Sequence, residues 1–144
     1  MKILVLNSGG SSAKFKVLDM PDEAVVAWGG VERIGKTDAI LKYETTGKEA
    51  LKKVLPVANH QEAISLILEK LTDPEAGAVQ RIDEIRAVGH RVLHVGNRMH
   101  HSVLIDEEVE AVVEAFCDKA PLHNPHNLHG IRACKALMPQ TPQV

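Results

Sequence analysis

The chain has few cysteines, few aromatic residues and no long apolar segment. Its two cysteines, Cys117 and Cys134, form no Cys-x-x-Cys pair and lack the spacing of metal ligands. Aromatic residues make up only 3% of the chain, so a core must consist mainly of Val, Ile, Leu and Ala. No apolar run approaches the length of a membrane-spanning helix, and no signal-peptide pattern opens the chain. We therefore expect a cytoplasmic protein with reduced, buried cysteines on helical faces and no membrane contact.

The chain also lacks an excess of either charge. Seventeen Lys and Arg residues oppose 19 Asp and Glu residues, which gives a formal net charge of −2. Nucleic-acid-binding domains usually carry a basic surface, and this balance gives no sign of one. Hydrophobic residues account for 44% of the 144 positions, enough for one domain with its own core. The composition is typical of a soluble globular domain, and we expect no nucleic-acid partner.

Apolar patterns predict strands in the first 57 residues. Segments typical of strands occupy residues 2–6, 13–19, 24–31, 40–46 and 50–57. The glycine pair Gly29-Gly30 is expected to interrupt the third segment. Short turns between the segments favour an antiparallel or mixed sheet over an immediate β-α-β unit.

The rest of the chain predicts helices that flank this sheet. Asn59 and Glu62 resemble a capping box, and apolar residues at helical spacing continue to Leu71. Further predicted elements are strands at 85–93 and 103–105, a helix after Asp106, and a helix with Asn124 as N-cap and Pro125 at its first position. The residues thus predict an α/β domain with a mixed sheet. The chain stops where another strand is expected, so we expect an incomplete unit.

A small polar turn follows the first predicted strand. Asn7, two glycines, Ser11 and Ser12 come directly after the apolar run, and Lys14 follows them. Glycines let the backbone approach a ligand closely, and hydroxyl, N–H and ammonium groups bind anionic oxygens. The spacing differs from that of a Walker A loop. The turn therefore predicts either a phosphate-binding site or an ordinary hairpin turn.

Two further polar residues interrupt apolar segments. Arg91 lies where a buried strand is expected to end, so it needs an anionic partner. That partner is either a carboxylate of the protein or the carboxylate or phosphate of a substrate. His123 lies between two prolines before a helix, where its imidazole either donates to a phosphoryl oxygen or packs to shape the turn.

The other histidines show no metal-binding motif. The chain contains no His-Glu-x-x-His sequence, and no carboxylate or cysteine accompanies the histidines at ligand spacing. We therefore expect surface histidines, not a zinc site, at His90, His94, His100, His101, His126 and His129.

Three motifs together resemble the acetate and butyrate kinase family. They are residues 7–15 (Asn-Ser-Gly-Gly-Ser-Ser-Ala-Lys-Phe), 88–94 (Val-Gly-His-Arg-Val-Leu-His) and 120–125 (Ala-Pro-Leu-His-Asn-Pro). The second and third motifs are specific, and their order and spacing match the N-terminal domain of that family. The resemblance implies an actin/Hsp70/sugar-kinase-like (ribonuclease H-like) fold. It also implies that residues 1–144 are the single N-terminal, carboxylate-side domain, truncated before its last elements, and that the C-terminal nucleotide domain is absent.

The resemblance also implies a reaction. Members of the family transfer the γ-phosphoryl group of ATP to acetate, giving acetyl phosphate and ADP reversibly, with Mg²⁺ as cofactor. By resemblance, the roles are Asn7 for Mg²⁺; Lys14, Ser11 and Ser12 for the nucleotide phosphates; Arg91 for the carboxylate or the phosphoryl group; His123 for the phosphoryl oxygens; and Leu93 and Leu122 for the acyl pocket. We expect these groups to converge on one anion-binding hollow.

Some positions depart from the family pattern and leave alternatives open. Gly10 replaces a usual serine, Leu93 a usual valine, and Val95 a usual glycine. The catalytic aspartate of the family lies beyond residue 144, so little or no turnover is expected from this chain alone. Its full-length parent is expected to be a homodimer. The alternatives are a fragment of a propionate or butyrate kinase, and a non-catalytic phosphate-binding or interaction module on the same fold.

Overall fold

A six-stranded sheet and three α-helices form the core of the computed structural model, which describes all 144 residues. The strands are β1 (Lys2–Ser8), β2 (Ser12–Asp19), β3 (Ala24–Glu32), β4 (Lys36–Thr45), β5 (Leu51–Val57) and β6 (Ile85–His90). The helices are α1 (His60–Leu71), α2 (Glu107–Ala115) and α3 (Asn124–Leu137), and a short 3₁₀ helix at Ile82–Glu84 precedes β6. None of these helices has the length and apolar character needed to cross a membrane.

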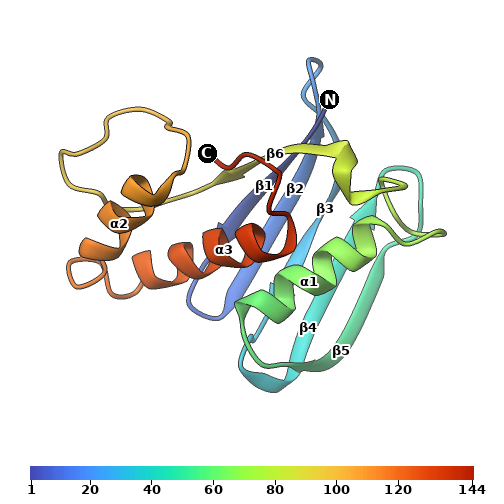
Figure 1. Cartoon of the computed structure of the whole chain (residues 1–144). Helices are drawn as coiled ribbons and strands as arrows, with labels where there is room; N and C mark the ends of the chain where they lie inside the picture. Colours follow the sequence, from blue (N-terminus) through green and yellow to red (C-terminus); the bar gives the residue numbers. More distant parts are fainter.

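The sheet is mixed, as the sequence predicts. Its strand order is β5-β4-β3-β2-β1-β6 (Figure 1). Strands β1 to β5 form an antiparallel meander, whereas β6 pairs with β1 in parallel. Because β1 and β6 run in the same direction, their carboxyl ends lie at the same edge of the sheet. The β1–β2 turn, residues 9–11, lies at this edge too.

Helices cover one face of the sheet. Leu4 and Leu6 of β1 and Phe15 of β2 are buried on that face, and α1 and α3 pack over it (Figure 1). The alternate residues, including Asn7 and Lys14, are exposed on the opposite face. The period-two pattern of β1 and β2 is therefore the pattern of a sheet with one covered face.

The last residues of the chain lie along the outer edge of β6. The amide of Val88 donates to the carbonyl of Pro142 at 2.9 Å, and the amide of His90 donates to the carbonyl of Val144 at 2.7 Å. The amide of Val144 donates back to the carbonyl of Val88 at 2.8 Å. This pairing is parallel to β6 and occupies the edge of the sheet at that point.

Five local predictions are wrong. The glycine pair does not interrupt β3, because β2 and β4 approach so closely there that only glycine fits. The strand expected at 85–93 ends at His90, and the segment 103–105 pairs with no strand. The N-cap of α3 is His123 instead of Asn124. Cys117 lies beyond the end of α2 and is only half-buried, whereas Cys134 is buried in α3 as expected.

Candidate functional site

The site begins with the meeting of three segments at the carboxyl edge of β1 and β6. The side chain of Asn127, in the second turn of α3, joins them. Its Nδ2 donates to the carbonyl of Ser8 at 2.8 Å, and its Oδ1 accepts from the amide of Leu93 at 3.2 Å. The β1–β2 turn (residues 9–11, the Gly/Ser turn), the segment after β6 and the start of α3 therefore lie side by side.

A second buried amide strengthens this junction. Asn124 is fully buried, and its Nδ2 donates to the carbonyl of His94 at 2.5 Å. Its Oδ1 accepts from the amide of the same residue at 3.2 Å. These paired bonds hold the segment after β6 against α3 and thereby fix the course of Leu93 and its neighbours.

Sequence reasoning missed both asparagines as positioning residues. Asn124 and Asn127 lie on the same buried helical stripe as Leu128, Ile131 and Cys134. A polar amide on an otherwise apolar stripe signals a buried hydrogen-bonding role, because an unsatisfied amide there costs free energy. The sequence shows this pattern, but it does not show that the hydrogen-bond partners of the two amides are the carbonyls of Ser8 and His94.

The polar and charged side chains of the site lie on the face of the sheet that no helix covers. Asn7 and Lys14 are direct partners in the β1–β2 register, and both are exposed. The amide of Arg91 donates to the carbonyl of Leu6 at 3.1 Å, which places Arg91 just past the end of β6 beside Asn7. The three side chains therefore come from adjacent positions on neighbouring strands.

Arg91 has no anionic partner within the protein. It is exposed rather than buried, so the expectation of a buried arginine with an obligatory partner is corrected. None of the ion pairs of the chain involves Arg91 or Lys14. A guanidinium without an internal carboxylate is free to bind an external one in a fork.

Two neighbouring hollows, which meet at Leu93, lie at this edge. The larger, of about 600 Å³, is lined mainly by apolar residues and includes Arg91 and Leu93. The smaller, of about 430 Å³, is lined by Leu93, Leu122 and His123 among others. Asn7, Ser11, Ser12 and Lys14 line neither. The expected single hollow is therefore not found, because Arg91 and His123 border different hollows and the residues of the turn border neither.

His123 is positioned at the start of α3 with its ring free. It is the N-cap of the helix, yet its side chain makes no capping hydrogen bond, and the residue is exposed. Pro125 lies two positions further on, within the first turn. The partial positive charge of a helix N-terminus favours anions, so an anion bound beside this imidazole would be stabilised by both.

Another histidine near the site, His90, is half-buried, contrary to the expectation of a surface residue. Nε2 of His90 lies 2.6 Å from the side-chain amide of Gln143. Burial lowers the pKa of His90 from 6.5 to about 4, although the contact with Gln143 raises it slightly. His90 is therefore neutral at pH 7 in the folded chain and becomes protonated more readily in the unfolded chain.

We expect this burial to make the chain acid-sensitive. Below pH 6.5 the unfolded state binds a proton at His90 that the folded state does not, so stability is retained above pH 6.5 and falls as the pH drops toward 4. A shift of this size corresponds to roughly 3 kcal/mol. Urea unfolding at pH 7 and at pH 4.5 measures the loss, and the variant His90→Gln should show a smaller one. His101→Gln, which removes an exposed histidine, is the control and should lose as much stability as the unmodified chain. An equally large loss in His90→Gln would show that His90 does not cause the acid sensitivity.

Comparisons with known proteins decide the family. A sequence profile of the acetokinase family matches residues 2–144. The chain belongs to the acetokinase family. Among curated acetokinase relatives, the acetate kinase of Carboxydothermus hydrogenoformans is 49% identical over 144 residues, which are the whole chain and 36% of that relative. This chain thus spans about a third of the length of the curated relatives it matches.

Solved structures of the acetokinase family share the fold. The crystal structure of Porphyromonas gingivalis acetate kinase superposes with a TM-score of 0.94 at 42% identity, over 99% of this chain and 36% of that one. A propionate kinase from Francisella tularensis gives a TM-score of 0.88 at 30% identity, over 99% and 35% of the two chains. The predicted actin/Hsp70/sugar-kinase-like fold is therefore confirmed.

Proposed function

We propose that this chain is the carboxylate-side, N-terminal part of an ATP-dependent acetate kinase. The observation that carries the proposal is the unpaired guanidinium of Arg91, which borders a mainly apolar hollow beside Leu93. A short fatty acid has one carboxylate and a small apolar tail, and this arrangement offers a partner for each. Family membership and the acetate kinase relatives support the same substrate.

The proposed reaction needs little covalent chemistry from the protein. A carboxylate oxygen of acetate forms a bond to the γ-phosphorus of ATP, and the bond from that phosphorus to the bridging oxygen of ADP breaks. Acetate is already ionised at pH 7, so no general base is required. The protein must orient the two anions and offset charge on the phosphoryl oxygens. In this proposal Arg91 holds the carboxylate or the phosphoryl group, and His123 donates to a phosphoryl oxygen.

The proposal assigns the other predicted residues to the nucleotide side. Lys14, Ser11 and Ser12 lie near the phosphates of ATP, and Asn7 supplies one oxygen ligand to Mg²⁺. The exposed amide of Asn7 fits that role, since Mg²⁺ prefers oxygen ligands and commonly keeps phosphates and waters in its shell. When bound, Mg²⁺ neutralises phosphate charge. We also propose that the full-length parent is a cytoplasmic enzyme and forms a homodimer.

A chimera tests the proposal. Met1–Val144 replaces the matching N-terminal segment of an acetate kinase relative, and acetyl phosphate formation is measured with ATP, Mg²⁺ and acetate. We expect activity from the chimera and none from the isolated chain, which offers only part of the charge that must surround the phosphoryl group. Robust turnover by the isolated chain would refute this division between two parts. A folded but inactive chimera whose binding of acetyl phosphate still depends on Arg91 would favour a non-catalytic module.

The propionate kinase neighbour gives a second candidate substrate of the same class. Leu93 lies at the junction of the two hollows, where its side chain limits the space for an acyl tail. We expect the chimera to prefer acetate to propionate and butyrate, and Leu93→Ala to raise the ratio of propionate to acetate kcat/KM. The expected change is about fourfold, since one buried methylene contributes about 0.8 kcal/mol. Initial rates on the three acids measure it, with Leu104→Ala, an exposed leucine outside both hollows, as control. An unchanged ratio would remove Leu93 from the acyl pocket.

A further inference from the structure

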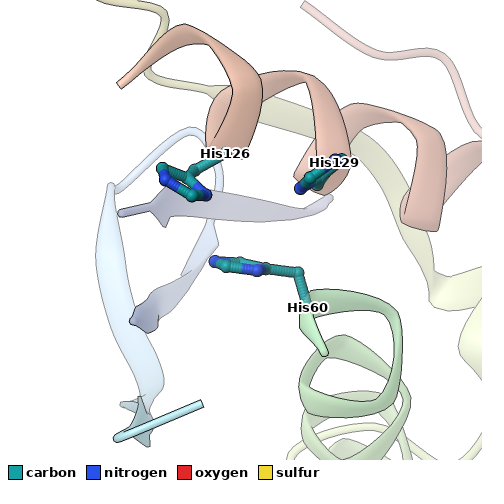
Figure 2. A group of neighbouring side chains, drawn as sticks. All are labelled: His60, His126 and His129. Carbon is teal, nitrogen blue, oxygen red and sulfur yellow. The ribbon is translucent and has the colours of Figure 1, made fainter. Parts of the chain in front are cut away.

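Three histidines meet in a hollow that the proposed reaction does not use. His60 begins α1, and His126 and His129 lie three residues apart in the first turns of α3 (Figure 2). One ligand nitrogen from each ring lies within 4.8 Å of the others. The hollow beside them has a volume of about 410 Å³ and also borders Gly10 and Arg132. Residues far apart in the sequence thus present three imidazoles to one point.

The ring nitrogens have lone pairs to offer. Nε2 of His60 lies 2.6 Å from the carbonyl of Gly9, which can only accept, so Nε2 carries the proton and Nδ1 keeps its lone pair. Nδ1 of His126 is buried and has no hydrogen-bond partner. An unpartnered buried nitrogen calls for a ligand, because leaving it unsatisfied costs free energy.

The surroundings of the cluster favour a cation. A ligating histidine commonly donates its other ring N–H to a backbone carbonyl, as His60 does to Gly9. The nearby positive charge of Arg132 is offset by Glu114, whose carboxylate lies 3.1 Å away, and by Glu110 at 3.7 Å. Gly10 lies directly beside the cluster, since a Cβ there would be in van der Waals contact with Nε2 of His126 at 3.5 Å.

We propose that His60, His126 and His129 bind one Zn²⁺ ion, with water at the fourth position. Three imidazoles and an open position form a known type of tetrahedral zinc site. Zinc–nitrogen bonds of 2.0–2.1 Å place ligand nitrogens about 3.3 Å apart, so small rotations of the rings close the present cluster around the ion. Mg²⁺ is excluded from this site because it prefers oxygen ligands.

The bound ion would fasten three parts of the fold together. His60 links the start of α1 to the Gly9 carbonyl. Through the ion, His126 and His129 would link α3 to both. Zinc would therefore stabilise the edge of the domain that carries the Gly/Ser turn. The site stands on its own geometry and does not depend on the proposed kinase activity.

Calorimetric titration of the tag-free chain with ZnCl₂, in buffer containing excess Mg²⁺, tests the proposal. We expect one equivalent to bind, a higher Tm with zinc, and the visible absorption of tetrahedral Co²⁺ when cobalt replaces zinc. His129 is exposed, so His129→Gln should fold normally, and it should weaken binding by at least the roughly 10- to 100-fold that loss of an outer-shell partner causes. His100→Gln, an exposed histidine outside the cluster, should bind as the unmodified chain does.

Several outcomes would overturn the site. These are the absence of saturable binding, equal affinity in the His129→Gln and His100→Gln variants, and several equivalents of equal affinity, which would indicate scattered surface histidines. Octahedral Co²⁺ absorption would also contradict three-imidazole tetrahedral ligation. His126→Gln provides a second test, since it removes the buried unpartnered nitrogen, and its circular dichroism spectrum establishes that the fold is retained.

Discussion

Replacing Arg91 with alanine should lower kcat of the chimeric enzyme by two to three orders of magnitude. The side chain has no partner in the protein and borders the apolar hollow, so its free charge is available to the reacting anions. A group that stabilises developing charge in the transition state typically contributes about 10²- to 10³-fold to the rate. Steady-state kinetics with ATP, Mg²⁺ and acetate measure the change.

The division of the effect between kcat and KM separates two roles of Arg91. If the guanidinium holds the carboxylate in the ground state alone, KM for acetate rises and kcat is retained; if it follows the phosphoryl group, kcat falls. We expect the fall in kcat. Arg91→Lys should recover only a small part of it, because an ammonium group cannot form the bidentate fork.

A matched arginine gives the control for charge and fold. Arg86 is exposed on β6, the strand that ends just before Arg91, and it makes no ion pair and borders neither hollow. Arg86→Ala should therefore leave kcat within about twofold of the parent chimera. Similar losses in Arg86→Ala and Arg91→Ala would show that a general electrostatic or folding effect, and not the position of Arg91, explains the result.

The sequence predicted the arrangement of the strands better than the arrangement of the site. The alternation of apolar and polar residues in β1 and β2 indicates which face of the sheet is buried. The short turns between strands indicate antiparallel neighbours, so the meander could be derived from residues 2–57. The predicted N-cap of α1 is also confirmed, since Oδ1 of Asn59 accepts from the amide of Glu62 at 2.9 Å. These features depend on neighbours in sequence.

The features that the sequence did not predict depend on contacts between residues distant in the chain. Asn127 acts on Ser8, 119 residues away, and no local pattern records such a bond. The histidine cluster joins α1 to α3 in the same way, so spacing along one helix gave no sign of the third ring. The end of β6 at His90 is also a tertiary effect, because the next residues turn toward the buried amides of α3 instead of continuing the strand.

Gly29→Ala, in the glycine pair of β3, should lower the free energy of unfolding by about 4 kcal/mol or more. A Cβ at residue 29 would lie 2.1 Å from the carbonyl oxygen of Lys42 on β4, and φ of +148° is a conformation that side chains rarely adopt. The neighbouring Gly30 is restricted from the other side, since its Cβ would lie 2.5 Å from the carbonyl oxygen of Ala13 on β2. Backbone atoms cannot move aside as flexible side chains do, so the central strands must separate.

Urea unfolding followed by circular dichroism and by the fluorescence of Trp28, the only tryptophan, measures this loss. Gly89→Ala is the matched control, because Gly89 also lies in a strand but a Cβ there meets no atom within 4 Å. That variant should change stability by less than about 1 kcal/mol, with a small gain from the lower entropy of the unfolded chain. A Gly29→Ala chain within 1 kcal/mol of the parent would contradict the close approach of β3 and β4. Failure of Gly29→Ala to fold, beside a normal Gly89→Ala, would support it, because the two changes add the same methyl group and differ only in what that group meets.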